Sequence, residues 1–205
     1  MNRKRKLLNA VLESPLSNLK LIPRFSDIYM HRRETVADHN WDLIALALVI
    51  VPEWNKDLVR KIDLKEVLYR IAVHDLDESG SIDIPRPFKY FNMDLKKKLD
   101  EVSLEILRSK KVSEDIIKDI RTAKDFSTLE GFVVKILDII QPGLVMIDEI
   151  SIGNTKMKRE LPNIIGQIDY FFEILSQEDM NLEQKLRDRI HDFLNDFQTY
   201  IIKFQ

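Results

Sequence analysis

The stretch Ala72-Val73-His74-Asp75-Leu76-Asp77-Glu78 lies near the middle of this 205-residue chain and places a His-Asp doublet after an apolar segment. Leu68, Ile71 and Ala72 recur at helical spacing, so we expect a buried helix that ends near His74. Ionised carboxylates are costly to bury unless they pair with a cation. The stretch therefore indicates either a metal site with a catalytic acid beside it or a helix end that meets water. Because short motifs match by chance, the other segments must decide between these interpretations.

The composition limits the class of protein. With 44% hydrophobic and 32% charged residues and only 5 glycines, the chain is expected to be folded and rich in helices. Its length is most simply that of one domain, residues 1–205. The absence of cysteine excludes disulfides and Cys-zinc sites and is compatible with a reducing cytoplasm. The longest apolar run, Leu43 to Val51, is too short to span a membrane. The apolar run after the basic N-terminus is too short for a signal peptide, so we expect a cytoplasmic protein.

Helix start and stop signals divide the chain into several further helices. The expected helices are Arg3 to Leu12, one opened by Thr35 or Asp38 and ended by Pro52, one opened by Asp63, Met93 to Lys110, Glu114 to Ala123 with Ser113 as cap, one opened by Ser127-Thr128 and kinked or broken at Pro142, Ile164 to Leu175, and Leu182 to Ile202. The glycine, serine and proline content of residues 79–87 predicts a loop after the doublet. The fold class is therefore expected to be all-α, a helical bundle.

Polar side chains on three of these helices are candidates for a metal site in the bundle core. His39 lies beside an apolar helix face, where a lone histidine is more often structural than a ligand. Asp138 sits within a strongly apolar segment, which favours a ligand or salt-bridge role. His39, His74, Asp75 and Asp138 come from three separate helices, as in the metal sites of other helical folds. Two imidazoles and two carboxylates suit one divalent ion, either manganese, cobalt, iron, nickel or zinc, with magnesium also open.

Other residues can complete a phosphate-cleaving site around such an ion. A divalent ion polarises a phosphoryl oxygen and lowers the pKa of a water that it binds. Glu78 and Asp83 are the candidates to take a proton from that water. The cations that can neutralise phosphate charge are Arg24, Arg32, Arg33, Arg86 and Lys89. For Arg24 with Phe25, a surface charge beside a core ring is the simpler interpretation from these two residues alone.

The order of these residues resembles that of the HD-domain phosphohydrolases, which carry a His, then His-Asp, then a distant Asp. More narrowly, the sequence resembles the YfbR-like bacterial 5'-deoxynucleotidases over roughly residues 18 to 160. The shared segments are Leu19-Lys20-Leu21-Ile22 followed by Arg24 and an aromatic, Glu34, Val36 and Asp38-His39, then Glu78, Asp83, Pro85 and Lys89-Tyr90-Phe91-Asn92, and finally Val134 to Asp138 and Glu149 to Asn154. Several linked segments in the same order make this match specific.

The resemblance implies an all-α, often dimeric enzyme that removes phosphate from deoxynucleoside 5'-monophosphates with a divalent metal. It implies that His39, His74, Asp75 and Asp138 are the ligands. It also implies that Glu78 orients or activates the attacking water, that Asp83 acts as an acid or substrate contact, and that Arg24 binds phosphate.

Three positions depart from the family pattern. The aromatic residue after Arg24 is Trp in the family and helps to reject a 2'-hydroxyl, whereas here it is Phe25, which leaves the strictness of deoxyribose selection open. Ile82 stands where the family has Gly, and Pro142 has no family counterpart. These departures bear on the choice of substrate more than on the chemistry.

Two alternative functions remain open at this point. One is a deoxynucleoside triphosphate triphosphohydrolase, since His31-Arg32-Arg33 with Arg86 can reach further phosphates. The other is a catalytically degenerate nucleotide-binding or regulatory protein, against which the presence of all four ligand positions and Glu78 argues. The expected partners are a small-molecule nucleotide substrate and a second copy of the chain. A net charge of -2 gives little support to nucleic-acid binding.

Overall fold

The computed structural model describes residues 14–80, 93–176 and 182–205, and the regular elements within them are helices. The elements are η1 (Pro15–Leu21), α2 (Val36–Trp54), α3 (Leu64–Val73), η2 (Leu76–Gly80), α5 (Met93–Ser109), α6 (Glu114–Ala123), α7 (Leu129–Ser151), η3 (Thr155–Arg159), α8 (Leu161–Ser176) and α9 (Gln184–Ile202), where η marks a 3-10 helix. An isolated bridge joins Pro23 to Thr35. The predicted all-α fold class is confirmed, whereas the predicted helix from Arg3 to Leu12 lies outside the described residues. In these ranges no helix has the combination of length and apolarity needed to cross a membrane.

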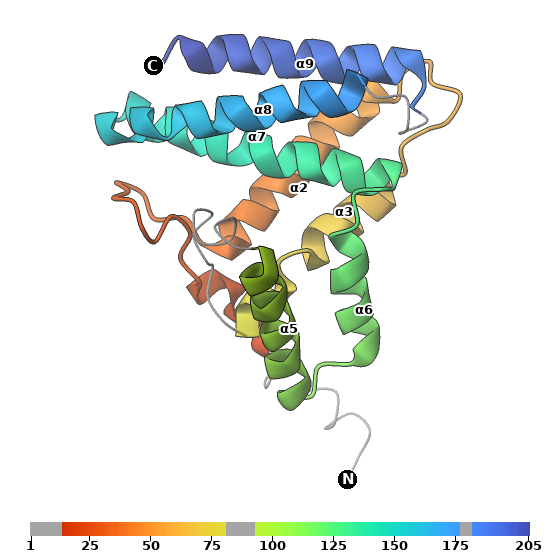
Figure 1. The fold of residues 1–205 in the computed structure, drawn as a ribbon, viewed down its shortest axis with the longest axis vertical. Helices are drawn as coiled ribbons and strands as arrows, with labels where there is room; N and C mark the ends of the chain where they lie inside the picture. Colours follow the sequence, from red (N-terminus) through yellow and green to blue (C-terminus); the bar gives the residue numbers. More distant parts are fainter. Residues whose placement is uncertain (1–13, 81–92, 177–181) are drawn as a thin grey trace.

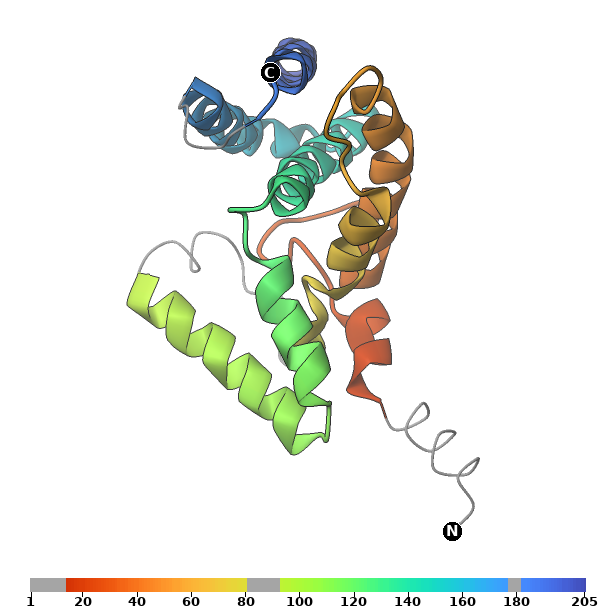
Figure 2. The same cartoon turned by 90° about the vertical axis from the view of Figure 1, so that its right-hand side faces the viewer.

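The helices are arranged in layers (Figure 1). Helices α7, α8 and α9 stack on one another, and α2 and α3 pack against the opposite side of α7. Helices α5 and α6 lie at the far end of the molecule from α9, as a second view also shows (Figure 2). The main apolar core fills the space among α2, α3, α7, α8 and α9, with Trp54 against Phe193 and Phe132 against Phe171.

A second, smaller apolar cluster holds the segment that follows the His-Asp doublet. Leu104 and Leu107 of α5 pack there with Ile117 and Ile120 of α6, and Leu76 of η2 packs against this cluster. Val67 and Ile71, on α3 just before the doublet, belong to the main core instead. The doublet is therefore fixed from both sides, by the main core before it and by the smaller cluster after it.

Side-chain caps set the starts of the helices that lead to the doublet and to the two other predicted ligands. Thr35 and Asp38 form a complete capping box at the start of α2, and Asp63 accepts hydrogen bonds from two backbone N–H groups at the start of α3. Helix α7 is capped by Thr128 rather than Ser127, since the Thr128 hydroxyl accepts from the N–H of Gly131. Each cap fixes the register of its helix and hence the direction of the side chains one to three turns later.

Two prolines lie inside helices: Pro52, which was predicted to end one helix, and Pro142, which was predicted to kink or break another. Helix α2 continues past Pro52 to Trp54, and α7 continues past Pro142 to Ser151. Pro52 is in the last turn, where few backbone hydrogen bonds remain to be lost. At Pro142, packing against other helices compensates for the lost backbone hydrogen bond. A Cβ on the adjacent Gly143 would lie 2.9 Å from Phe197 and 3.2 Å from Ile164, which shows how tightly α7 is held against its neighbours.

The buried carboxylate of Glu149 anchors the segment between η1 and α2. It accepts backbone N–H hydrogen bonds from His31 at 2.7 Å and Arg32 at 2.9 Å, and a side-chain bond from Asn154 at 2.7 Å. Asn154 also donates to the carbonyl of Tyr29 at 2.8 Å. Burial opposes the charge of Glu149, but these donors lower its pKa below the ordinary value of 4.5. Residues 29–32 are therefore tied to the C-terminal end of α7.

Replacement of Glu149 by glutamine is expected to lower the free energy of unfolding by about 1.5–3 kcal/mol near neutral pH, as for lost hydrogen bonds to a charged group. Because the folded pKa is depressed, this contribution is complete above the ordinary value of 4.5 and is lost as the pH falls through the folded pKa. Urea denaturation of the parent and of Glu149→Gln should show a difference in the free energy of unfolding that becomes smaller in acid. Asp148→Asn, which removes an exposed ion pair with Arg32, is the control and should cost under about 1 kcal/mol. Equal losses of stability in both variants, or a stability difference for Glu149→Gln that does not change with pH, would contradict this assignment.

Candidate metal centre

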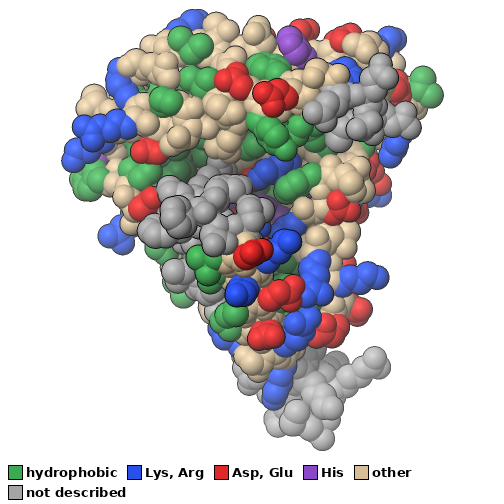
Figure 3. Space-filling model, viewed as in Figure 1, with side chains coloured by type: hydrophobic (Ala, Val, Ile, Leu, Met, Phe, Trp, Pro, Cys, Tyr) green, Lys and Arg blue, Asp and Glu red, His purple; other side chains and the backbone are tan. Residues whose placement is uncertain are grey.

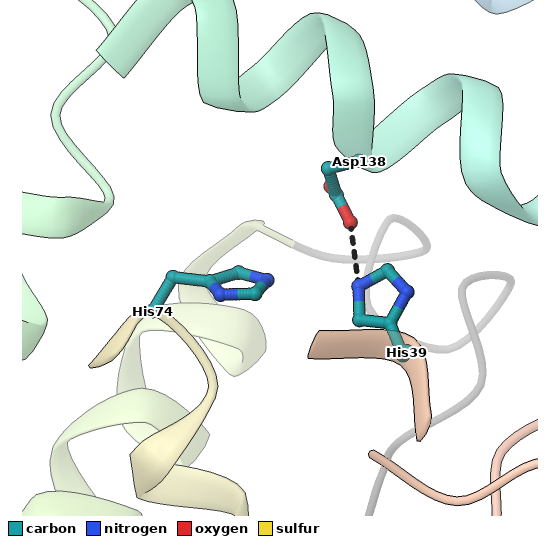
Figure 4. Close-up of side chains that lie close together, drawn as sticks. All are labelled: His39, His74 and Asp138. Carbon is teal, nitrogen blue, oxygen red and sulfur yellow. Dashed lines mark ion pairs between the residues drawn. The ribbon is translucent and has the colours of Figure 1, made fainter. Parts of the chain in front are cut away.

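Three helices bring two imidazoles and a carboxylate together in the interior (Figure 4). His39 is in the first turns of α2, His74 is the C-cap of α3, and Asp138 is in the middle of α7. One ligand atom from each of these side chains lies within 4.8 Å of the other two. His39 Nε2 is 3.3 Å from Asp138 Oδ1, and the two imidazole ring centres are 5.6 Å apart. The structure brings these three predicted residues together, and their role as metal ligands stays a prediction.

Asp75 borders the same space from the turn after α3. Its Oδ2 lies 3.1 Å from His74 Nε2 and 3.8 Å from His39 Nε2. Ligand atoms around an ion with bonds of about 2.0–2.2 Å lie roughly 3–4 Å from one another. Asp75 therefore lies within this spacing of both Nε2 atoms, whereas the group whose ligand atoms all lie within 4.8 Å of one another consists of His39, His74 and Asp138.

The two Nε2 atoms supply the observation that tests whether this set suits a metal. Both are buried and have no hydrogen-bond partner among the described residues. Their Nδ1 atoms, by contrast, are engaged: that of His39 with the side-chain oxygen of Gln141 at 2.8 Å, and that of His74 with the carbonyl of Ile71 at 2.8 Å. A buried polar atom without a partner is costly, and metal-ligating histidines usually donate their other ring N–H to an oxygen in this way. The residues present fit a divalent cation.

The electrostatics of the cluster favour positive charge between the rings and the carboxylates. Burial disfavours a charged His74, but Asp75 and Asp138 outweigh it and raise the pKa of His74 to about 9. Burial likewise opposes ionisation of Asp75, yet the charge of His74 lowers the pKa of Asp75 well below its usual range. Burial and Arg24 lower the pKa of His39, against the pull of the carboxylates. A divalent cation in this space takes the place of a proton.

Polar side chains behind His39 form a network that the sequence did not reveal. Gln141, 1% exposed, donates to Glu34 Oε1 at 3.3 Å and to Asp42 Oδ2 at 3.1 Å. Burial raises the pKa of Glu34 to about 7, although Arg24 and Gln141 act in the opposite direction. A polar residue on the buried face of an apolar helix is the signal that singles out Gln141 in the sequence.

Two lysines beside the carboxylates were also missed. Lys135 Nζ is 2.9 Å from Asp138 Oδ2, so the two oxygens of Asp138 face a lysine and His39 respectively. Lys124 Nζ is 2.6 Å from Asp77 Oδ2; burial opposes its charge, but Asp77 and Asp75 raise the pKa of Lys124. The i,i+3 spacing of Lys135 and Asp138 could have indicated the first pair. The pair of Lys124 and Asp77 joins α6 to η2, and no pattern in the neighbouring sequence indicates it.

Glu78 follows the His-Asp doublet on η2, and Arg24 lies in the segment between η1 and α2. Glu78 lies on η2, is 9% exposed, and its backbone N–H donates to the carbonyl of Asp75 at 3.0 Å. Arg24, whose side chain is 12% exposed, lies 3.5 Å from Glu34 and packs over the Phe25 ring at 5.6 Å. Phe25 has a φ of 52°, a left-handed conformation that costs a non-glycine residue about 1 kcal/mol. Strain of this kind is typical of functional positions.

The remaining predicted site residues are Arg33, which lies at a surface pocket, and three residues outside the described ranges. Arg33 is exposed and lines a pocket between α2 and α7 together with Asp38, Asp42 and Asp148. Asp83, Arg86 and Lys89 fall within residues 81–92, which the structure does not describe. A hollow in the middle of one face shows histidine and basic side chains at its edge (Figure 3). His191, predicted to be a surface residue, has a side chain 57% exposed.

Comparison with known proteins identifies relatives along most of the chain. A family model described as 5'-deoxynucleotidase YfbR-like matches residues 13–177. The 5'-deoxynucleotidase YfbR of Escherichia coli O127:H6 is 26% identical over 173 residues, which cover 78% of this chain and 86% of that protein. An HD-domain phosphohydrolase from Listeria innocua has a similar structure, with a TM-score of 0.67 at 21% identity over 96% of this chain and 98% of its own. The cyanophage S-2L HD phosphohydrolase DatZ, bound to dA and one catalytic Zn²⁺ ion, gives a TM-score of 0.52 at 16% identity over 92% and 95% of the two chains.

The family match contains every residue of the candidate centre. It includes α2, α3 and α7, which carry His39, His74 and Asp138, and the turn that carries Asp75. The two solved structures share the fold with this chain, in agreement with the helical architecture. The chain therefore belongs to the YfbR-like 5'-deoxynucleotidase family and is a metal-dependent phosphohydrolase of the HD-domain fold.

Proposed function

We propose that the enzyme removes the phosphate from deoxynucleoside 5'-monophosphates and releases a nucleoside and orthophosphate. The observation that carries this proposal is the pair of buried Nε2 atoms, both without a hydrogen-bond partner among the described residues, facing two carboxylates. Membership of the 5'-deoxynucleotidase family supports a nucleotide as the substrate. A binding protein with a degenerate site would have no need to retain this set of groups.

His39, His74, Asp75 and Asp138 are the proposed ligands of one divalent ion, of the manganese, cobalt, iron, nickel, zinc or magnesium type. When bound, such an ion polarises a phosphoryl oxygen and lowers the pKa of a water. Lys135 holds the second oxygen of Asp138 at 2.9 Å and so orients this carboxylate. The ion of the structurally similar DatZ is Zn²⁺, which fits this ligand set.

Glu78 is the proposed general base. Water attacks phosphorus, Glu78 accepts the proton that the water loses, and the bond from phosphorus to the 5'-oxygen breaks. Asp83 is proposed to protonate the departing 5'-oxygen or to contact the substrate. The position of Glu78 on the turn directly after Asp75 supports its role, because that turn is fixed to both apolar clusters.

The proposed substrate contacts are cationic and aromatic. Arg24, Arg33, Arg86 and Lys89 are assigned to the phosphate, and Phe25 to the sugar. Arg24 is the best supported, because its buried Nη1 atom lies near Glu34 without a hydrogen-bond partner among the described residues. A nucleotide phosphate would supply that partner. The nucleoside dA bound to DatZ is a ligand of the class proposed here.

Phosphate release from a panel of ribo- and deoxyribonucleoside mono- and triphosphates tests the substrate. We expect orthophosphate from deoxynucleoside monophosphates, activity lost with chelator and restored by manganese or cobalt. Turnover of the ribonucleotides would show that Phe25 does not select against the 2'-hydroxyl. Release of triphosphate from triphosphates alone would overturn the monophosphatase proposal and favour the triphosphohydrolase alternative. The absence of turnover of every nucleotide with every ion would overturn both the monophosphatase proposal and the triphosphohydrolase alternative.

We further propose that residues 1–205 act as one domain, in the cytoplasm, and as a homodimer. Trp41, Leu48 and Val49 on α2 are 67%, 50% and 69% exposed. Val49 also lines an apolar pocket between α2 and α7 together with Leu144. A second copy that covers these side chains would remove them from water. Sedimentation of the full chain tests the dimer, and a monomer at micromolar concentration would contradict it.

A further inference from the structure

Gln141 lies directly behind His39, on the opposite side of the imidazole from the candidate metal centre. Its side-chain oxygen is 2.8 Å from His39 Nδ1, and its side-chain nitrogen is 3.1 Å from Asp42 Oδ2 and 3.3 Å from Glu34 Oε1. Gln141 is 1% exposed and His39 is fully buried, so water does not compete for these hydrogen bonds. All the polar atoms of the Gln141 side chain are therefore engaged.

The partners of the amide nitrogen determine which way the amide faces. Carboxylate oxygens accept hydrogen bonds, so the NH₂ group of Gln141 must face Glu34 and Asp42. The amide oxygen is then left to face His39, and because it can only accept, His39 Nδ1 must carry a proton. A neutral imidazole with its proton on Nδ1 has its lone pair on Nε2. That lone pair is the one that faces Asp138 and Asp75.

The second imidazole has a proton held on its Nδ1 atom by another route. His74 Nδ1 is 2.8 Å from the backbone carbonyl of Ile71, which can only accept a hydrogen bond. The backbone thus keeps a proton on Nδ1 of His74, and no side-chain substitution removes that acceptor. The tautomer of His39 depends instead on one side chain, which makes it open to test while His74 serves as an internal reference.

We propose that Gln141 is a positioning residue that keeps the proton of His39 on Nδ1, so that Nε2 is free to bind the divalent cation, and that Glu34 and Asp42 orient the Gln141 amide. This inference rests on the proposed role of His39 as a ligand. It also connects the centre to the phosphate site, because Glu34, which accepts from Gln141, is 3.5 Å from Arg24. Loss of the Gln141 acceptor leaves His39 free to place its proton on Nε2, where it would compete with a cation.

The tautomer is measured directly in the metal-free full chain. Long-range ¹⁵N–¹H NMR correlations of the imidazole rings distinguish a protonated Nδ1 from a protonated Nε2 at slightly alkaline pH. We expect Nδ1 to be protonated in both His39 and His74 of the parent, and Nε2 of His39 to carry no proton. A proton on Nε2 of His39 in the folded parent would overturn the proposal, whatever the enzyme hydrolyses.

Variants separate positioning from simple packing. Gln141→Met keeps the volume of the side chain but removes the acceptor, and it is expected to weaken the binding of Mn²⁺ or Co²⁺ by about 10–100-fold, as is typical for residues that orient a metal-ligating histidine. The His39 proton should move to Nε2 while the His74 signals stay unchanged. Gln141→Glu, whose protonated carboxyl can donate to Asp42 and accept from His39, is expected to retain most of the affinity.

Gln198→Met is the matched control, because Gln198 forms an exposed hydrogen bond with Asp169 far from the centre. It should leave both the tautomer and the metal affinity unchanged. Unchanged affinity and tautomer in Gln141→Met, or equal losses in Gln141→Met and Gln141→Glu, would overturn the positioning role. A parent that binds no metal but keeps the proton on His39 Nδ1 would instead count against the proposed function.

Discussion

Replacement of His74 by asparagine is expected to abolish metal-dependent phosphate release. The loss should exceed ~100-fold, which is the upper end of the range for residues that contact a metal ligand but not the metal. The reason is geometric. His74 Nε2 lies 3.1 Å from Asp75 Oδ2 and is buried without a hydrogen-bond partner among the described residues. Without the imidazole, a cation in this space would keep two carboxylates and a single nitrogen. Activity with saturating Co²⁺ or Mn²⁺ and the dissociation constant of the ion are the measurements.

His191→Asn is the control for this substitution. His191 lies on α9, its side chain is 57% exposed, and it packs on Phe172 away from the centre. It should retain the activity and metal affinity of the parent. A His74→Asn variant that folds and binds the ion as tightly as the parent would contradict the assignment of His74 as a ligand.

Replacement of Glu78 by glutamine is expected to lower kcat by about 10²–10⁴-fold, the usual contribution of a general base. Glutamine has nearly the same shape as glutamate but cannot accept the proton that the attacking water loses. Because Glu78 is not a proposed ligand, the affinity for the ion and the KM for the nucleotide should change little. This separation of kcat from binding distinguishes the loss from that of His74→Asn.

Glu53→Gln supplies the control for Glu78→Gln, since Glu53 forms an exposed pair with Lys56 in the last turn of α2. It should leave kcat unchanged. If Glu78→Gln kept full kcat, another group would have to take the proton. If it lost the ion instead, Glu78 would belong to the ligand set.

Three of the four proposed ligands stand out in the sequence because each one conflicts with its local surroundings. His74 and Asp75 end an apolar helix, and Asp138 lies among isoleucines and leucines, so each of these needs a buried partner. His39 has no such local signal and was singled out by its order along the chain with the other three residues. The helices themselves follow from periodicity and caps, as at Thr35 and Ser113, so the fold class was open to prediction.

The network behind His39 could not be predicted in the same way. Gln141 is 107 residues from Glu34 and 99 residues from Asp42 in the chain. Only the crossing of α2 and α7 brings them together, and no local pattern encodes that crossing. The same holds for Lys124 and Asp77, which are 47 residues apart and meet where α6 approaches η2.

The prolines show the opposite case, in which tertiary packing overrides a strong local preference against helix. Pro142 has no N–H to donate to the carbonyl of Asp138, one turn earlier, and this predicted a kink or a break. The helix continues because Gly143 allows α7 to approach Phe197 and Ile164 closely. A local preference of a few kcal/mol is outweighed when a long apolar helix is buried among several others.

One divalent ion is proposed to be bound by His39, His74, Asp75 and Asp138. Crystals of the protein loaded with Co²⁺, measured at the cobalt absorption edge, would locate that ion. We predict one strong anomalous peak per chain, about 2.0–2.2 Å from both Nε2 atoms and from an oxygen of each carboxylate. A loaded protein whose anomalous signal lies elsewhere, with no peak between His39 and His74, would contradict the account.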